Sequence, residues 1–377
     1  MRKNKFLNVL TGLAAVGLTV LTMLLNTFGT YFFYHAFAEN DTAKVASEFR
    51  AYEDITPVEH TSVAAADLGD VMLIPLGNTF GIKLYTDGII VTSLAEIYAN
   101  GTTCCPAKDA GIQVGDYIVA IGDKEIENNK HFIDLLSQAI GGDIVLTIHR
   151  NEEIFTTTLV PVYDGTAFRC GMWVRDSAAG IGTLTFANPE TNSFAGLGHG
   201  ICDIDTKQLL SLGGGEPAPI TICDIVKGEK SNPGKINGFF SDTTSLGVLF
   251  DNNETGIYGK LNEIPSTNAI PLARADEVVA GSAQVLTSID NNGPQLFSAE
   301  IEQLSTSKKQ TTKNLVIRIT DPRLLELTGG IIQGMSGTPV LQNGKLAAAI
   351  THVFIDDPKR GYGIFAETMY KNSQNNF

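Results

Sequence analysis

The chain has 377 residues, of which 43% are hydrophobic and only 18% charged, so it is long enough for two domains with buried cores. Its 38 glycines favour a turn-rich β architecture over a helical bundle. A net charge of −14 with no run of Lys or Arg argues against nucleic-acid binding, because an acidic chain repels phosphate backbones.

The N-terminal segment predicts a membrane anchor. Three basic residues within the first five positions precede an uncharged stretch from Phe6 to Tyr34, and this stretch of 29 residues exceeds the length of about 20 that crosses a bilayer as a helix. Basic residues before such a span place the N-terminus in the cytoplasm and direct the downstream chain to export. Ala36-Phe37-Ala38 resembles a cleavage site, so a removed signal is the alternative. We expect residues 1–38 to be a stub with an anchor or signal, and the rest to lie outside the cytoplasm.

After a polar linker at 39–70, the chain alternates between strand and helix patterns. Short apolar runs at 71–75, 81–85 and 88–92 predict strands, and one apolar face over 129–140 predicts a helix. A Gly pair ends that helix, and two further strands are expected near 143–149 and 153–160.

The pattern Ala-x-x-Ala-Gly-Ile-x-x-Gly-Asp-x-Ile at 107–118 resembles PDZ domains of bacterial proteases, and the resemblance covers residues 71–162. It implies that an extended peptide adds a strand to a sheet edge beside the helix at 129–140. Backbone N–H groups of the loop Thr79-Phe80-Gly81-Ile82 would then receive a C-terminal carboxylate. The alternative is a packing module that binds nothing.

From residue 163 to 377 the chain is rich in glycine, turns and short apolar strands. This texture predicts an all-β barrel or sandwich. The expected strands are 181–186, 247–250, 283–288, 315–319, 340–341, 347–353 and 363–365.

A serine framed by glycines is the first candidate for chemistry. In Gly334-Met335-Ser336-Gly337-Thr338-Pro339, the turn can present Oγ of Ser336 outward as a nucleophile. The backbone N–H groups of Gly334 and Ser336 can point at one spot and form an oxyanion hole. The alternative is an ordinary Gly-Ser turn before a strand.

A nucleophilic serine needs a base, and histidine is the usual one. Of the six histidines, one abuts the apolar span, one lies in the linker and two belong to the PDZ-like region, which leaves His199 and His352. His199 lies on the Gly-rich loop at 196–200, where a functional side chain can be held exposed, whereas His352 falls in an expected strand. We therefore predict His199 as the base and keep His352 as the alternative.

The residues alone do not decide which acid would orient the base. Asp203 and Asp205 stand too near His199 in the chain to approach it from behind. Asp242 follows His199 by 43 positions, which suits a trypsin-like layout, and Asp321 precedes Ser336 by 15 positions.

Other chemistries have weaker support. A metal site of His199, Cys202, Cys223 and an Asp would lack a close second pair of ligands, and Cys202 as a nucleophile would lack a Gly-framed turn. We expect no metal and no cofactor. The five cysteines leave at least one unpaired within a monomer.

The single apolar span, the PDZ-like pattern, Gly-His-Gly-Ile-x-Asp at 198–203 and Gly-Met-Ser-Gly-Thr-Pro at 334–339 together resemble the stage IV sporulation protein B serine peptidase family. The resemblance implies a trypsin-like double β-barrel and a triad in the order His, Asp, Ser, with the acid at Asp321. An acid so close to the serine departs from ordinary trypsin-like spacing, so Asp242 stays an alternative.

The resemblance also implies a role. Members are signalling proteases of endospore formers that are exported to the space between the forespore and mother-cell membranes. They cleave themselves and then a membrane-bound regulator of an intramembrane protease, which leads to processing of a sigma-factor precursor. We expect this activity here, with the membrane contacted through residues 6–34. A non-catalytic PDZ adaptor with a protease-like domain is the alternative.

Overall fold

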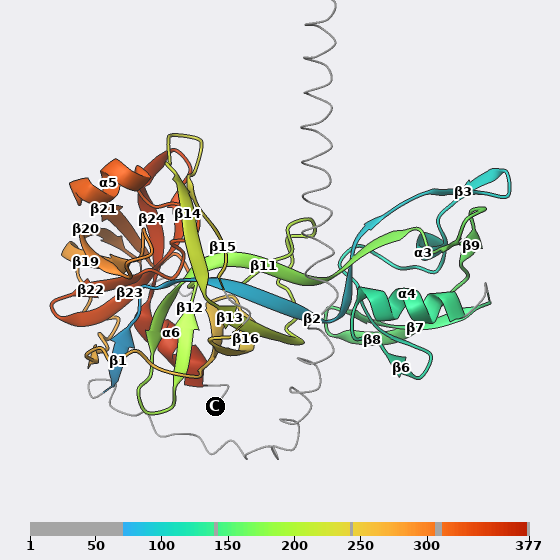
Figure 1. Ribbon diagram of the computed structural model, residues 1–377, viewed down its shortest axis with the longest axis horizontal. Coiled ribbons are helices and arrows are strands. Elements are labelled where there is room, and N and C mark those ends of the chain that lie inside the picture. The colour runs from blue at the N-terminus through green and yellow to red at the C-terminus, as the bar shows by residue number, and fades with distance from the viewer. Residues whose placement is uncertain (1–70, 139–141, 242–243, 306–310, 375–377) are drawn as a thin grey trace, which may run out of the picture. The chain divides into compact units, whose positions relative to one another are not determined.

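Figure 1 shows the computed structural model, which describes residues 71–138, 142–241, 244–305 and 311–374. Within these ranges no helix is long and apolar enough to cross a membrane. The predicted anchor at Phe6–Tyr34 and the linker at 39–70 lie outside them.

Two strands of 16 residues each, β2 (Thr79–Leu94) and β11 (Met172–Ala187), form a long two-stranded ribbon (Figure 1). They pair antiparallel from Thr79 opposite Thr183 to Leu94 opposite Met172, with two register shifts. One end of this ribbon belongs to a curved sheet, and the other end enters a smaller module made by the residues between the two strands.

The curved sheet has the order β16-β17-β12-β11-β2, with β13 paired to the outer side of β2. The N–H of Leu246, just before β16, donates to the carbonyl of Pro217 in β13, which brings the two ends of the sheet together. Apolar residues on one face of each strand, such as Phe80, Ile82 and Phe194, fill its core. The remaining bounds are β1 (Met72–Pro75), β12 (Ser193–Gly196), β13 (Gly214–Ala218), β16 (Gly247–Asn253), β17 (Gly256–Leu261) and β18 (Ile270–Pro271).

The inserted module is an α+β unit with its own core, which includes Ile89, Ile118, Phe132 and Ile148. Its sheet continues from β2 through β5 to β7 and β8, and α4 packs against it. Its elements are β3 (Ile97–Ala99), β4 (Thr102–Cys104), α3 (Pro106–Asp109), β5 (Tyr117–Ile121), β6 (Lys124–Glu125), α4 (Asn129–Gln138), β7 (Ile144–Arg150), β8 (Glu153–Leu159), β9 (Val162–Tyr163) and β10 (Phe168–Arg169).

The core of the inserted module begins within β2 and ends within β11. Residues up to Ile82 pack into cores outside the module, Leu84 lies in a small cluster with Ile90 and Leu210, and the module core begins only at Ile89. Between Tyr85 and Ile90 the pairing of β2 with β11 is irregular, Gly88 adopts φ 78°, and β2 continues beyond this stretch with its burial pattern shifted. The far end of the module reaches into β11, where Met172 and Val174 join its core.

The C-terminal part is a closed barrel with the order β19-β20-β21-β24-β23-β22. Val285, Phe297, Ile317 and Ile350 are among the buried residues of its core. The bounds are β19 (Gly281–Thr287), β20 (Gln295–Leu304), β21 (Leu315–Ile319), α5 (Pro322–Thr328), β22 (Pro339–Gln342), β23 (Lys345–Phe354), β24 (Asp357–Phe365) and α6 (Ala366–Ser373).

A separate hairpin, β14 (Ile220–Val226) and β15 (Lys235–Phe240), lies between β13 and β16 in the chain and packs against the core of the closed barrel. The residue pair Lys235 and Gln333 forms a parallel bridge, so β15 supports the segment that leads to Ser336. The prediction of a mainly β chain is confirmed.

Candidate active site

Ser336 lies in a turn that enters β22, and two glycines shape that turn. Gly334 has φ 102° and Gly337 has φ 94°, which side chains rarely adopt. A Cβ on Gly337 would lie 2.0 Å from the carbonyl oxygen of Thr183 and 2.5 Å from the N atom of Leu197. The absence of a side chain at Gly337 therefore lets the serine turn pack directly on β11 and on the residue after β12.

The polar groups of Ser336 are partly engaged. Its carbonyl accepts a hydrogen bond of 2.8 Å from the N–H of Thr183, and its Oγ donates one of 2.8 Å to the carbonyl of Thr351. In the described part of the chain, the N–H groups of Gly334 and Ser336 donate no hydrogen bond. This pair of free donors matches the requirement of the predicted oxyanion hole.

His199 follows β12 through two residues with positive φ, Leu197 at 65° and Gly198 at 69°. A Cβ on Gly198 would lie 2.9 Å from Cγ2 of Thr351, so this turn sits against β23. Nδ1 of His199 lies 2.9 Å from the carbonyl oxygen of Gly200. Because a carbonyl only accepts, this contact requires the proton on Nδ1 and leaves the Nε2 lone pair free to act as a base.

His352 is the neighbour of His199. Their ring centroids are 4.8 Å apart, and the ring planes differ by 34°. Burial of the half-buried His199 ring lowers its pKa, and the bond to Gly200 only partly offsets this. Desolvation of the His352 ring lowers its pKa to about 4, with smaller effects from the charges of His199 and Lys313. Both rings are therefore neutral at pH 7.

Two neighbouring residues of β23 thus bring Ser336 and His199 together. Ser336 bonds to Thr351, and His199 lies against His352. None of the hydrogen bonds within the described ranges joins Ser336 Oγ to His199, so the serine must turn from Thr351 before its proton can move to Nε2. Such bonds commonly tighten only once substrate is bound.

Asp321 has other partners than His199. It caps the N-terminus of α5, where Oδ1 accepts from the N–H of Arg323 at 3.0 Å, and Oδ2 accepts from the N–H of Ser298 at 3.1 Å. The guanidinium of Arg323 bonds both oxygens and, against the effect of burial, holds the pKa of the carboxyl well below its usual range. The structure does not bring Asp321 to His199, and Asp242 lies outside the described residues.

The structure places the residues of the predicted carboxylate-binding loop in a strand. Thr79, Phe80, Gly81 and Ile82 lie in β2, where they pair with β11 from Thr183 to Gly180. Gly81 and Ile82 also pair with β13 on the other side. Because this stretch belongs to a strand of the curved sheet, its backbone is not presented to a peptide.

Asn252 holds the loop that follows His199, and no pattern in the sequence signals this role. Its buried amide accepts from the N–H of Ile201 at 2.8 Å and donates to the carbonyls of Ile201 and Leu210 at 3.0 and 2.8 Å. In the sequence, Asp251-Asn252-Asn253 resembles a polar turn, whereas the three residues end β16. Only the long-range pairing reveals the role of Asn252.

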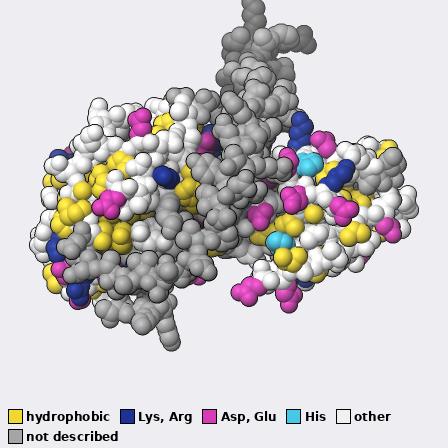
Figure 2. All heavy atoms as spheres, turned by 90° about the horizontal axis from the view of Figure 1, so that it is seen from below, with side chains coloured by type: hydrophobic (Ala, Val, Ile, Leu, Met, Phe, Trp, Pro, Cys, Tyr) yellow, Lys and Arg dark blue, Asp and Glu magenta, His cyan; other side chains and the backbone are white. Residues whose placement is uncertain are grey.

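The other chemistries gain no support from the geometry. Among the described residues, no group of three or more His, Cys, Asp or Glu could hold a metal ion. Desolvation raises the pKa of Cys202, which disfavours the thiolate that a cysteine nucleophile needs. On the face shown in Figure 2, the described Lys and Arg side chains are scattered among acidic ones.

Two family models match the chain. The model described as SpoIVB peptidase S55 matches residues 166–370, and a PDZ domain model matches residues 100–150. The first match spans more than half of the chain and contains His199, Asp321 and Ser336. The second lies within the inserted module and confirms its PDZ character. No curated protein matches the chain.

Several solved protease structures are similar at low identity. The inactive form of Rv3671c from M. tuberculosis is 15% identical, with 52% of this chain and 82% of that chain covered and a TM-score of 0.29. The HtrA-type protease AlgW with a decapeptide is 11% identical, with 53% of each chain covered and a TM-score of 0.32. The serine protease AL20 from an extremophilic microorganism is 14% identical, with 53% and 93% covered and a TM-score of 0.30.

Proposed function

Because the chain belongs to the SpoIVB peptidase S55 family and is a serine peptidase, we propose that Ser336 is its nucleophile and His199 its general base. The observation that carries this assignment is the meeting of both residues at Thr351 and His352 of β23. In the proposed reaction, Nε2 of His199 takes the Oγ proton while Oγ attacks the carbonyl carbon of the scissile peptide bond.

The N–H groups of Gly334 and Ser336 then receive the oxyanion, because they belong to the same turn and have no other acceptor among the described residues. His199 returns the proton to the leaving amine as the peptide C–N bond breaks. Water, activated by the same imidazole, releases the acyl group from Ser336.

Three groups are candidates for the one that orients Nδ1 of His199, and Asp242 stays the candidate that trypsin-like spacing gives. Family resemblance assigns it to Asp321, whereas the contacts of His199 assign it to the carbonyl of Gly200. A carbonyl fixes the same tautomer as a carboxylate would, but stabilises the imidazolium less because it carries no full charge. Replacement of Asp321 by Asn tests the family assignment, because it removes the charge of this carboxylate and leaves the other candidates unchanged.

We further propose the signalling role of the family for this chain. In this role the enzyme cleaves itself and then a membrane-bound regulator of an intramembrane protease, in a sporulation pathway that leads to processing of a sigma-factor precursor. The family match, the PDZ match and the uncharged stretch at Phe6–Tyr34 support this proposal. The proposed location is the extracytoplasmic face of a membrane, between forespore and mother cell.

The test uses the full chain in lipid vesicles. Wild-type protein should fragment with time and should cut a co-reconstituted regulator of this class, whereas Ser336→Ala should do neither and keep the same circular dichroism spectrum. Proteolysis that persists in Ser336→Ala, after contaminating proteases are excluded, would contradict the assignment. A folded wild-type chain that binds the regulator without cutting it would instead support the adaptor.

A further inference from the structure

The loop between His199 and Ser211 closes on the buried carboxylate of Asp203. One oxygen of Asp203 accepts from the N–H groups of Asp205 at 3.0 Å and Thr206 at 2.8 Å. Its own N–H donates to the carbonyl of Gln208 at 2.8 Å. Asp203 stands only four positions after His199, in the same motif, and the proposed reaction gives it no chemical step.

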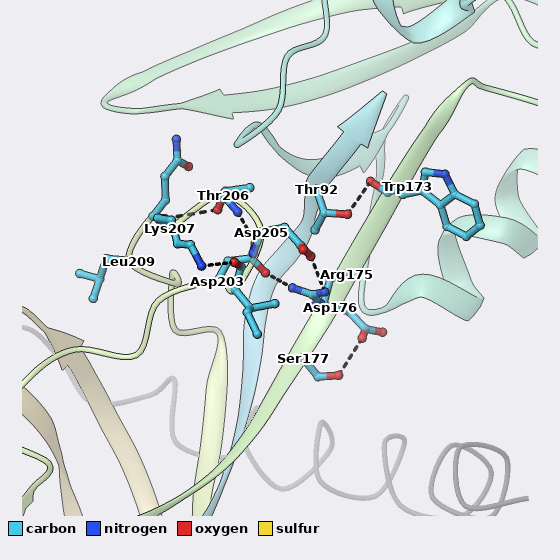
Figure 3. A network of polar contacts seen from close by, with 12 residues as sticks. Thr92, Trp173, Arg175, Asp176, Ser177, Asp203, Asp205, Thr206, Lys207 and Leu209 are labelled. Carbon is cyan, nitrogen blue, oxygen red and sulfur yellow. Dashed lines mark hydrogen bonds and ion pairs between the residues drawn. The ribbon is translucent and has the colours of Figure 1, made fainter. Parts of the chain in front are cut away.

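The second oxygen of Asp203 meets Arg175, as Figure 3 shows. The same guanidinium bonds Asp205 at 2.7 Å, so it joins two residues of the loop. Burial opposes ionisation of Asp203, but the amide donors and Arg175 outweigh it and lower the pKa of the carboxyl. A buried carboxylate whose partner is removed is strongly destabilised, so the loop depends on Arg175.

Arg175 itself belongs to the PDZ-like end of β11, where it pairs with Ile90 of β2. A second contact comes from Tyr117 of β5 in the same module. Its hydroxyl accepts from the N–H of Ser211 at 3.0 Å and lies 3.5 Å from the carbonyl of Leu209. At Gly115 a Cβ would lie 2.5 Å from the Gln208 amide, so the module and the loop are in close contact.

The loop is therefore held from two sides. Asn252 of the curved sheet fixes its root at Ile201 and Leu210, and the module fixes its tip at Asp203 and Asp205. The carbonyl of Gly200, which orients His199, lies between the histidine and this fixed root.

We propose that Arg175 is a positioning residue: by holding Asp203 it fixes the loop that orients His199, so that the PDZ-like module sets the geometry of the base. The inference rests on the proposed role of His199. A displacement of β11 in the module reaches the loop at Asp203 and Asp205 through the guanidinium of Arg175, without contact between a bound peptide and the catalytic residues.

The test measures kcat and KM of the full chain on a small ester that does not need the PDZ-like module. Arg175→Ala should lower kcat about 10-fold with KM within about two-fold, because small misplacements of a catalytic group are costly. Arg175→Lys keeps one charged bond to Asp203 and should recover part of the loss. Active-site titration with a fluorophosphonate corrects each rate for the folded fraction.

The matched control is Arg169→Ala. Arg169 lies in the same module and pairs with Asp164 at 2.8 Å, away from the His199 loop, so its removal should leave kcat within about two-fold. In a double-mutant cycle, Asp203→Asn should add little to Arg175→Ala, because both variants break the same contact.

Equal kcat in Arg175→Ala and wild type, or equal losses in Arg175→Ala and Arg169→Ala, would overturn the proposal. So would additive losses in the cycle. Failure of the catalytic assignment is recognised separately, because Ser336→Ala would then keep its activity on the ester.

Discussion

The imidazole of His199 is held by a main-chain carbonyl in this structure, while the carboxylate of Asp321 is committed to α5 and Arg323. The carboxylate of Asp321 would matter to very different extents as a member of the triad and as a helix cap. Removal of a true triad carboxylate costs about 10⁴-fold in turnover, whereas removal of a helix cap costs about 1 kcal/mol of stability.

Asp321→Asn separates these roles, because asparagine can still cap a helix but cannot carry a negative charge. If Gly200 orients the base, kcat on a small ester should stay within about three-fold of wild type, by analogy with caps that do no chemistry. The free energy of unfolding in urea should fall slightly as the ion pair with Arg323 is lost. A loss of about 10⁴-fold in kcat would return Asp321 to the triad.

The two histidines make the reaction depend on pH in a defined direction. Burial lowers the pKa of His199, so the acid limb of kcat/KM should have its midpoint below 6.5, the ordinary value for histidine. His352→Ala opens one side of the His199 ring to water and should move that midpoint upward. A midpoint above 6.5 in the wild type, or an unmoved limb in His352→Ala, would contradict this account of the site.

The serine turn depends on contact as well as on backbone conformation, and two glycines separate these effects. Gly337 and Gly344 both have positive φ, but a Cβ on Gly344 would meet nothing within 4 Å. Gly344→Ala should therefore cost about 1 kcal/mol of unfolding free energy. Gly337→Ala adds a clash with Thr183 and should cost about 3 kcal/mol or more and remove activity. Equal costs in thermal unfolding would contradict the packing described for the turn.

The strands and helices show how much of the fold can be predicted from the sequence. Alternation of apolar residues predicts Leu315–Ile319 with its bounds unchanged, and the helix over 129–140 is described from Asn129 to Gln138. Both patterns are local. The two short strands expected at 81–85 and 88–92 form one strand, β2, because the chain pairs again with β5 at Ile89 and with β11 at Ile90 after an irregular stretch, and these partners lie far along the chain.

The same distinction applies to the candidate site. Ser336 and His199 stand in Gly-rich turns that a sequence displays directly. Asn252 and Arg175 act only through partners that are distant in sequence, 51 residues away for Ile201 and 28 for Asp203, so no local pattern identifies them.

Insertion of the PDZ-like module within the curved sheet constrains where the chain can cut itself. A cut between β2 and β11 would divide the sheet that carries His199. A cut in residues 39–70 would release the peptidase from the predicted anchor and leave the curved sheet and the PDZ-like module whole. Because this segment is tethered to the active site, its effective concentration there is about the mM range.

We therefore expect the self-processed form to begin between residues 39 and 70 and to keep the module. N-terminal sequencing of the product checks this, and a first cut after residue 162 would contradict it. Substitution of Gly81, a residue of the predicted carboxylate-binding loop, cannot test peptide binding, because a Cβ there would lie 2.3 Å from the ring of Phe240 and disturb the sheet.

The most direct test of the central claim is covalent labelling of the full chain by a fluorophosphonate, with mass spectrometry to locate the modified peptide. We predict one adduct, on Ser336, formed in the wild type and in His352→Ala. Labelling should be lost in Ser336→Ala and slowed about 10³-fold or more in His199→Ala, because nucleophile and base act as a unit. An adduct on another residue, or labelling that is lost in His352→Ala and unchanged in His199→Ala, would contradict the assignment of Ser336 and His199.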